Sequence, residues 1–404
     1  MRQTDVLIAG GGLAGSLAAA MLRRAGIDAI MADPHATYPV DFRCEKLDRV
    51  QLERFRMTGV DAAVLRESTP DRNCWVARFG RHIDTIPMMM QRGVAYETLV
   101  NAVRSQIPDD GSFIVSKVSD VTTGPDRQTV KLSNGEEISA RLVVLSTGLN
   151  IGLQHKLGVE RKVFSATHSI CIGFDVQPAG GSSFPFTAMT YFAEKPENCA
   201  AYITLFPVGG TMRANLFVYR DLQDPWLVRF RTAPVETLND MWPGLRKLMG
   251  DFTVPSQIKI RPADLYVSAG HRQDGVVLVG DAFSTSCPVA GTGARKALVD
   301  VERLCNVYIP QWLATPGMDA AKTAMFYDDP DKLACDAFSA RKAFELRSSS
   351  INPGLRWAAM RWAKFAVNAG RGIVHRLSAA SPVSVEEAMA DDTPIWSPHT
   401  PAHK

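Results

Sequence analysis

Residues 5–15 read DVLIAGGGLAG, a short apolar run followed by a glycine-rich turn. The apolar run has the length of a strand, and the leucines and alanines of residues 13–25 favour a helix. Gly10 permits a sharp turn, Gly12 permits close approach of the backbone to a phosphate, and Gly15 permits close packing of helix on strand. Free N–H groups at the start of such a helix attract phosphate. The stretch therefore predicts a strand, turn and helix that bind a dinucleotide.

A second apolar run, residues 29–32, ends at Asp33. The acid follows the glycines at close to the spacing, about 20 residues, at which a carboxylate holds the hydroxyls of an adenosine ribose. Its charge would repel a 2′-phosphate. The alternative is a glycine-rich turn without a ligand, but strand, helix and acid are all in register for a binding site. This region alone leaves NAD and FAD both open.

Residues 275–281 bear on the choice between the two cofactors. The run GVVLVG, residues 275–280, predicts a buried strand, Asp281 stands at its end, and residues 294–305 predict the helix that follows. A carboxylate at the end of a strand can accept hydrogen bonds from sugar-like hydroxyls, which suits the ribityl chain of FAD.

The loop after this strand is poor in side chains. Gly291, Thr292 and Gly293 precede the helix, and Pro288 would stiffen the approach to it. Backbone N–H groups and a helix dipole can stabilise the negative charge of a reduced flavin. An ordinary strand-to-helix turn with an N-terminal cap is the alternative. Together with residues 5–15, however, the loop indicates FAD.

These motifs resemble those of the single-component (group A) FAD-dependent monooxygenases of the para-hydroxybenzoate hydroxylase type. The resemblance spans roughly residues 5–305 and includes Arg43 in the segment DFRCE, residues 41–45. It implies that the first glycines surround the pyrophosphate, that Asp33 holds the adenosine ribose, and that Asp281 binds the ribityl chain. The FAD contacts that it implies are Gly10, Gly12, Leu13, Ala14, Gly15, Asp33, Arg43, Val118, Gly148, Asp281, Pro288, Gly291, Thr292 and Gly293.

The sequence departs from the family pattern at two places. The family usually has an Asp-Gly pair after a strand in mid-chain, associated with both FAD and NAD(P)H, whereas this chain has Thr147-Gly148. The sequence therefore does not decide whether NADH or NADPH reduces the flavin directly. The alternative is that a partner protein supplies the electrons. Tyr96 stands where the family often has arginine.

The resemblance and the patterns together predict an α/β fold. We expect a Rossmann-like FAD-binding domain of the glutathione-reductase type, interleaved with an antiparallel β-sheet domain for substrate and followed by a helical region. The FAD-binding segments are expected at 1–76, 96–164 and 262–310, the substrate segments at 77–95 and 165–261, and the helical region at 311–404.

The predicted substrate sheet offers candidate contacts. Tyr202, Thr204 and Phe206 alternate along one strand and would share a face, although aromatic residues of this kind also fill cores. Met88-Met89-Met90 provides adaptable apolar surface or core filler. Among the histidines only His168 is a candidate base, and a lone histidine just before a strand more often has a structural role.

Composition excludes several classes of function. The chain has 404 residues, 46% hydrophobic and 22% charged, as in a globular protein, and its net charge of +3 gives no argument for nucleic acid. The seven scattered cysteines lack metal-ligand spacing and fit reduced thiols. We expect no metal site, no signal peptide and no membrane span, and hence a cytoplasmic protein.

The C-terminal part is unusually basic. Residues 339–380 contain eight Lys or Arg and one acid, Glu345. Residues 355–377 form an apolar stripe at helical spacing with cations opposite, which predicts an amphipathic basic helix. Such a helix can pack on its own domain with a solvated basic face. Alternatively, it can contact a reductase, an acidic carrier protein or an anionic membrane surface, or it can flank a channel to the flavin.

We therefore predict a flavin-dependent oxidoreductase. The first hypothesis is a monooxygenase that uses O2 and a flavin C4a-hydroperoxide to hydroxylate a small aromatic or electron-rich metabolite. The second is a reductase, dehydrogenase or halogenase-like enzyme on the same core that receives electrons from a partner. The third is an FAD-bound protein with little turnover whose basic helix recruits a partner or membrane.

Overall fold

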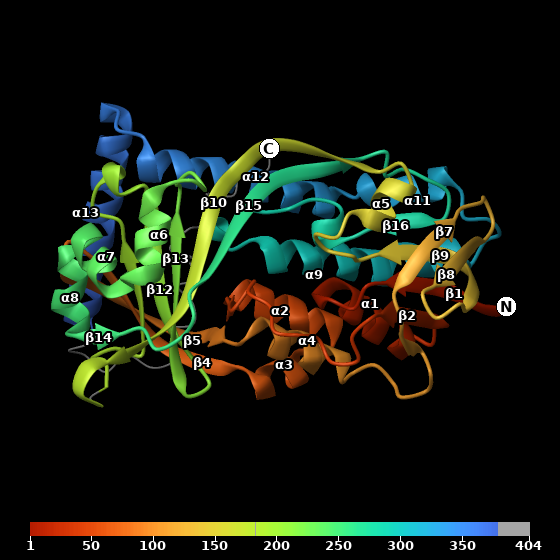
Figure 1. Ribbon diagram of the computed structural model, residues 1–404, viewed down its shortest axis with the longest axis horizontal. Helices are drawn as coiled ribbons and strands as arrows, with labels where there is room; N and C mark the ends of the chain where they lie inside the picture. Colours follow the sequence, from red (N-terminus) through yellow and green to blue (C-terminus); the bar gives the residue numbers. More distant parts are fainter. Residues whose placement is uncertain (182, 379–404) are drawn as a thin grey trace.

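The computed structural model describes residues 1–181 and 183–378, without the side chains of residues 87–90 and 375–378. The segment Met88–Met90 is therefore described only as backbone, and residues 379–404 of the expected helical region lie outside the described chain. The molecule is elongated, with one β-sheet toward each end of its long axis (Figure 1). This arrangement confirms the predicted α/β fold class.

A seven-stranded sheet carries the first glycine-rich turn. Its parallel part has the order β6-β2-β1-β9-β16, and the β7–β8 hairpin pairs with β9. Parallel strands end at one common edge, so the segments that follow β1, β2, β9 and β16 converge there. The strands are β1 (Arg2–Ala9), β2 (Ala29–Asp33), β6 (Phe113–Val115), β7 (Val118–Thr122), β8 (Gln128–Leu132), β9 (Glu137–Leu145) and β16 (Val276–Leu278).

A nine-stranded, largely antiparallel sheet forms the second layer. β11 pairs with β4 in parallel, and β10 and β15 form a long antiparallel ribbon that extends toward the first sheet (Figure 1). The strands are β3 (Lys46–Leu47), β4 (Thr69–Arg78), β5 (Arg81–Gly93), β10 (Glu160–Pro178), β11 (Ala188–Phe192), β12 (Ala200–Val208), β13 (Thr211–Val218), β14 (Phe252–Thr253) and β15 (Lys259–Ala269).

Three strands cross the expected domain boundaries. β4 begins at Thr69, before the expected boundary at residue 76, and β10 begins at Glu160, before residue 165. β15 ends at Ala269, beyond residue 261. The physical reason is that β10 and β15 pair along the whole ribbon, from Glu160 with Ala269 to Gly173 with Lys259.

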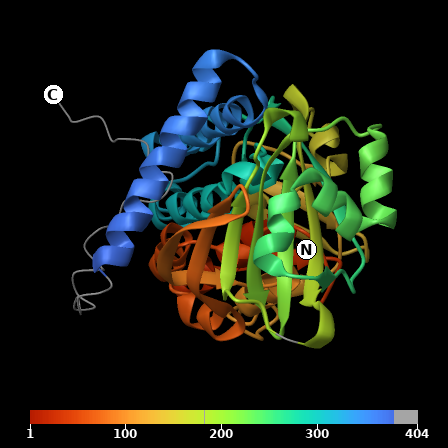
Figure 2. The ribbon, with the colours of Figure 1, turned by 90° about the vertical axis from the view of Figure 1, so that its left-hand side faces the viewer.

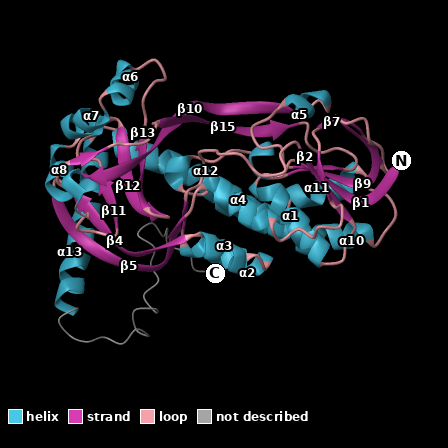
Figure 3. Ribbon diagram, turned by 60° about the horizontal axis from the view of Figure 1, so that its bottom comes forward, coloured by secondary structure: helices cyan, strands magenta, loops and turns pink. Residues whose placement is uncertain are grey.

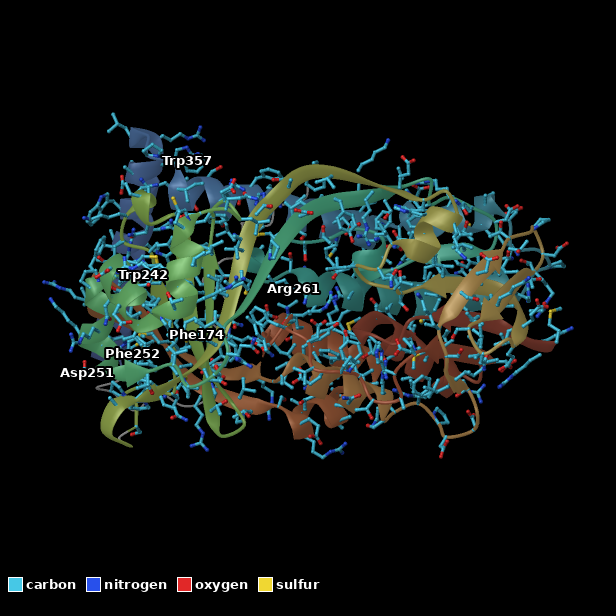
Figure 4. The ribbon with its side chains drawn as sticks, viewed as in Figure 1. Phe174, Trp242, Asp251, Phe252, Arg261 and Trp357 are labelled. Atoms are coloured by element: carbon cyan, nitrogen blue, oxygen red, sulfur yellow. The ribbon has the colours of Figure 1, made fainter. Side chains whose placement is uncertain are left out.

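Helices cover both sheets. α6, α7 and α8 close one face of the nine-stranded sheet over a core that includes Phe174 and Trp242 (Figure 4), and α13 packs beside β5 (Figure 3). The helices are α1 (Leu13–Arg24), α2 (Arg49–Thr58), α3 (Asp61–Glu67), α4 (Tyr96–Arg104), α5 (Gly152–Lys156), α6 (Pro225–Thr232), α7 (Pro234–Met241), α8 (Pro243–Met249), α9 (Gly293–Arg303), α10 (Ile309–Leu313), α11 (Ala320–Tyr327), α12 (Pro330–Ile351) and α13 (Leu355–Ser378).

Candidate functional site

A cavity of about 3400 Å³ extends from the edge of the seven-stranded sheet to the nine-stranded sheet. Its wall includes Gly10–Ala14 after β1 and Pro288–Gly293 before α9, although almost 280 residues separate these segments in the sequence. The two segments thus meet at one cavity, as binding of a single long ligand requires.

The glycine turn after β1 has no room for side chains. Gly10 has φ +105°, and a Cβ there would lie 2.7 Å from the carbonyl oxygen of Ser146. A Cβ at Gly15 would overlap the carbonyl of Gly10, so α1 packs directly on the turn. α1 begins at Leu13, and its N-cap residue, Gly12, makes no side-chain capping bond. The N–H groups at this helix start therefore suit a diphosphate.

Asp33, at the end of β2, lies next to this turn and is held in place by three donors. Its carboxylate accepts hydrogen bonds from the N–H of Gly11 at 2.7 Å and of His35 at 2.9 Å, and it pairs with Arg104 at 3.1 Å. Asp33 lines the cavity, as does Val118 at the start of β7. The structure thus brings both predicted adenosine-side residues to the same wall.

Arg104 is a residue that sequence reasoning missed. Its buried guanidinium, at the end of α4, also donates to the carbonyls of Gly11 at 2.5 Å and His35 at 2.6 Å. It therefore fixes the relative position of the glycine turn and Asp33. The available signal was helical spacing: Arg104 follows Val100 by four residues, which places it on the apolar face of α4.

Arg43 and Asp281 meet across the middle of the cavity. Arg43 Nη1 lies 2.7 Å from Asp281 Oδ2, and Arg43 Nε lies 2.7 Å from Asp41 Oδ2. Asp41 also pairs at 2.7 Å with Arg261, which Figure 4 shows between the two sheets. Desolvation alone would raise the pKa of Asp41, but hydrogen bonds and charge from Arg43 and Arg261 lower it to about 2. Two segments remote in sequence are thereby joined by ion pairs.

The helix start at α9 forms another part of the wall. Gly291 has φ +66°, and Thr292, the N-cap, makes no side-chain capping bond because its hydroxyl pairs with Ser339 Oγ at 2.6 Å. The backbone N–H groups of the first turn thus remain without a side-chain cap. Pro288 and Gly293 also line the cavity. A helix N-terminus of this kind stabilises a negative charge that lies close to its N–H groups.

A buried ion network supports the Gly280-Asp281-Ala282 turn from behind. Asp300 on α9 accepts a 2.9 Å hydrogen bond from the N–H of Gly280 and pairs at 2.8 Å with Lys332 on α12. Lys332 also pairs with Asp336 at 3.1 Å. Although desolvation opposes its charge, Asp300 and Asp336 raise the pKa of Lys332. The turn is therefore held by two helices.

Gly148 follows β9 and lines the cavity with φ +57°, near the Arg43 guanidinium. Thr147, which stands where the family usually has aspartate, donates its hydroxyl to the carbonyl of Asn150 at 3.0 Å. Residues 146–150, Ser-Thr-Gly-Leu-Asn, contain no carboxylate. This loop therefore lacks the charge that an Asp-Gly pair would bring.

Of the three residues predicted to contact substrate, two line the cavity and one does not. Tyr202 and Thr204 on β12 line the cavity, and Tyr202 donates a 2.5 Å hydrogen bond to the carbonyl of Val289. Phe206 was expected on the cavity wall but is not part of it. It is fully buried and packs against Cys74 and Ala188. The pleat of the strand does place these alternate residues on one side, but the cavity ends before Phe206.

Glu45 is the second residue that sequence reasoning missed. It lines the cavity at 2% exposure, and its Oε2 lies 3.2 Å from Arg213 Nε on β13. With its amide oriented to donate, Asn215 places its nitrogen 3.1 Å from the same oxygen. Desolvation raises the pKa of Glu45 to about 7 despite the charge of Arg213. A buried carboxyl with such a pKa in a cavity can exchange a proton near neutrality.

His168 has the structural surroundings that a lone histidine more often has. His168 is fully buried, bonded to Ser165 Oγ at 2.9 Å and to the carbonyl of Ala343 at 3.3 Å, and it is not part of the cavity wall. His82 on β5 lines the cavity instead, with its ring stacked on Trp75. Within residues 1–181 and 183–378, no group of His, Cys, Asp or Glu has an arrangement that could hold a metal ion.

Comparison with known proteins agrees with this geometry. The family model described as the FAD binding domain matches residues 3–309. The chain belongs to this FAD-binding family. This match confirms the resemblance to group A monooxygenases. The protein is a flavin-dependent oxidoreductase. No protein with a curated description matches the chain in sequence.

Solved structures show the same fold at low sequence identity. The p-nitrophenol 4-monooxygenase PnpA of Pseudomonas putida DLL-E4 is 15% identical with a TM-score of 0.72, covering 92% of this chain and 95% of that one. Aklavinone-11 hydroxylase, solved with FAD and aklavinone, is 20% identical with a TM-score of 0.69, covering 88% and 70%. The flavin-dependent brominase Bmp2 is 17% identical with a TM-score of 0.68, covering 92% and 94%.

Proposed function

We propose that this flavoprotein is a monooxygenase that hydroxylates a small aromatic or other electron-rich metabolite with O2. The observation that carries the proposal is the continuity of the cavity, whose wall includes the glycine turn, the α9 helix start and an aromatic sheet face with Phe192, Tyr202 and Phe217. A flavin ring held by the α9 end would face a substrate held by the sheet. Aromatic walls suit a flat apolar ligand.

The residues present fit FAD. The glycine turn and Asp33 would hold its diphosphate and adenosine, and Arg43 with Asp281 would hold its middle part. When bound, FAD would supply two-electron reduction and activation of O2, chemistry that side chains lack. Tyr202, through its bond to Val289, fixes the loop against the sheet and helps to keep water out of the cavity. Glu45 can accept a proton from a substrate hydroxyl at this place.

The alternative is an enzyme on the same core that receives electrons from a separate reductase. The observation that favours it is the Thr147 loop, which lacks the usual carboxylate. Under this alternative neither NADH nor NADPH reduces the flavin directly, and the reaction is a reduction, a dehydrogenation or a halogenation.

The test is anaerobic mixing of FAD-loaded protein with NADH or NADPH in the presence of a panel of phenols and other small aromatic metabolites. O2 is then added, and flavin absorbance and product mass are recorded. A ligand that accelerates flavin bleaching, followed by a product containing an atom of labelled O2, supports the monooxygenase. Turnover only with an added reductase supports the alternative. Protein without affinity for FAD would refute both.

The variant Thr147→Asp tests whether the missing carboxylate determines the electron donor. If the missing carboxylate limits reaction with the nucleotide, this variant should be reduced by NADH or NADPH faster than the wild type. An unchanged rate of reduction would show that Thr147 does not control the electron donor.

A further inference from the structure

α13 faces the protein with a different side from the one that its sequence predicts. The periodicity of residues 355–377 predicts an apolar stripe toward the domain and cations outward. Instead, Arg361 donates to the carbonyls of Ser349 and Asn352, and Gly372 packs so closely on β5 that a Cβ would overlap the carbonyl of Ile83. The inward face is therefore narrow and partly polar.

The outward face of α13 is apolar along most of its length. Its large side chains are between 52% and 91% exposed, and small apolar residues are exposed between them. Figure 2 shows α13 as the outermost helix along one edge of the molecule. The exposed apolar residues are Leu355, Ala359, Trp362, Ala363, Ala366, Val367, Ile373 and Val374. Soluble monomers rarely leave so continuous an apolar surface uncovered, which makes this face a candidate docking surface.

Charge on and beside the helix is positive. α13 contains five Lys or Arg and no Asp or Glu, and exposed Arg356 and Lys364 border the apolar face. Arg341 and Lys342 on α12 add cations nearby, and the acids close to the helix are Glu345 on α12 and the buried Asp84 on β5. An apolar stripe with Trp, on a helix whose own charged residues are all cations, is the pattern of a helix that lies in the interface of an anionic membrane.

We propose that α13 docks the protein on an anionic lipid surface. The stripe spans about 30 Å, the length of 20 helical residues, so it can lie flat in the interface. Within the described chain, no helix combines the length and apolar character needed to cross a membrane. The cavity reaches this helix, because Arg371 and Val374 are part of its wall. Docking therefore places the cavity beside the lipid.

Charge argues against other partners. A second copy would bring two helices that carry cations and no acids into contact, which is unfavourable for a symmetric dimer. An acidic protein would pair with the bordering cations but leave the apolar centre of the face without a matching partner. An anionic lipid surface matches both the cations and the apolar centre of the face, because its headgroups can contact the cations and its acyl region can contact the stripe.

The test is flotation of the full-length protein with vesicles of phosphatidylcholine alone or mixed with phosphatidylglycerol. We expect binding to the anionic vesicles to be on the order of tenfold stronger, and to weaken with salt. The double variant Val367→Glu, Ile373→Glu should lose on the order of tenfold or more of this binding. Val228→Glu on α6 is the matched control, because Val228 is 63% exposed and Val367 61%; it should bind as the wild type does.

Other outcomes overturn the proposal. Wild type that does not bind anionic vesicles, or binding that the double variant retains, would refute it. A dimer in light scattering that Val367→Glu disrupts, without vesicle binding, would assign the face to a second copy. Residues 379–404 include the acids Glu386 and Glu387, which could pair with the cations of α13. Binding that appears only after Glu386→Gln and Glu387→Gln would assign the face to this C-terminal segment. FAD absorbance of the variants, recorded in parallel, separates this question from the proposed reaction.

Discussion

At the scale of single residues, substitution of Arg104 tests what stabilises the end of the cavity that contains Asp33. Arg104→Gln would leave Asp33 and three carbonyls without their cation in a buried place. We expect a loss of about 3–5 kcal/mol in the free energy of unfolding, as for other broken buried ion pairs, and weaker FAD binding. Arg104→Lys should recover part of the stability, since it keeps the charge but not the forked geometry. Urea unfolding and FAD titration measure both effects.

A control for Arg104 is Arg66→Gln, because Arg66 is 64% exposed and its ion pair is with the neighbouring Glu67. It should change stability by less than about 1 kcal/mol. Equal effects of the two glutamine variants would contradict the assignment of Arg104 as a support of the site.

The raised pKa of Glu45 predicts that the free energy of unfolding depends on pH. Folding raises its pKa from 4.5 to about 7, so the folded state binds the proton more tightly than the unfolded state. The stabilisation is complete below pH 4.5 and is lost as pH rises to 7, by an amount on the order of 3 kcal/mol. Glu45→Gln cannot show this loss. Urea unfolding of both proteins between pH 5 and 8 measures it, and parallel pH profiles would contradict the prediction.

At the scale of elements, the pairing of α9 with α12 is predicted to depend on a buried charge pair. Lys332→Met leaves Asp300 buried without its cation behind the Gly280 turn, and should cost about 3–5 kcal/mol in the free energy of unfolding. Adding Asp300→Asn removes the unpaired charge and retains an acceptor for the Gly280 N–H. The double variant should therefore be more stable than the single one in chemical denaturation. A single variant as stable as the wild type would contradict this account.

The elements also show what the sequence could and could not predict. The glycine turn and the α9 start were predictable because their chemistry is local: a few consecutive residues define strand, turn and helix. Arg104 and Glu45 were missed because their partners come from distant elements, so burial and pairing are tertiary facts. For α13, periodicity defined an apolar stripe, but close packing at Gly372 decided which side faced the protein.

At the scale of the whole molecule, the cavity extends between the two sheets, and elements of both contribute to its wall. A ligand that spans it should stabilise the chain in proportion to how many of its walls it touches. On the proposed binding, FAD would reach from the Asp33 end to the α9 end, whereas FMN, which lacks the adenosine, would not contact Asp33 or Val118. Flavin-free protein should therefore gain more stability from FAD than from FMN.

The size of this effect follows from linkage. At a free concentration of 100 times its Kd, FAD should add about 2.7 kcal/mol to the free energy of unfolding, and FMN at the same concentration should add much less. Thermal unfolding with each flavin measures the difference. Asp33→Asn should bring the effect of FAD closer to that of FMN while leaving the FMN effect unchanged. Equal stabilisation of the wild type by both flavins would mean that the Asp33 end of the cavity does not hold the adenosine, and that the two glycine segments do not share one FAD molecule.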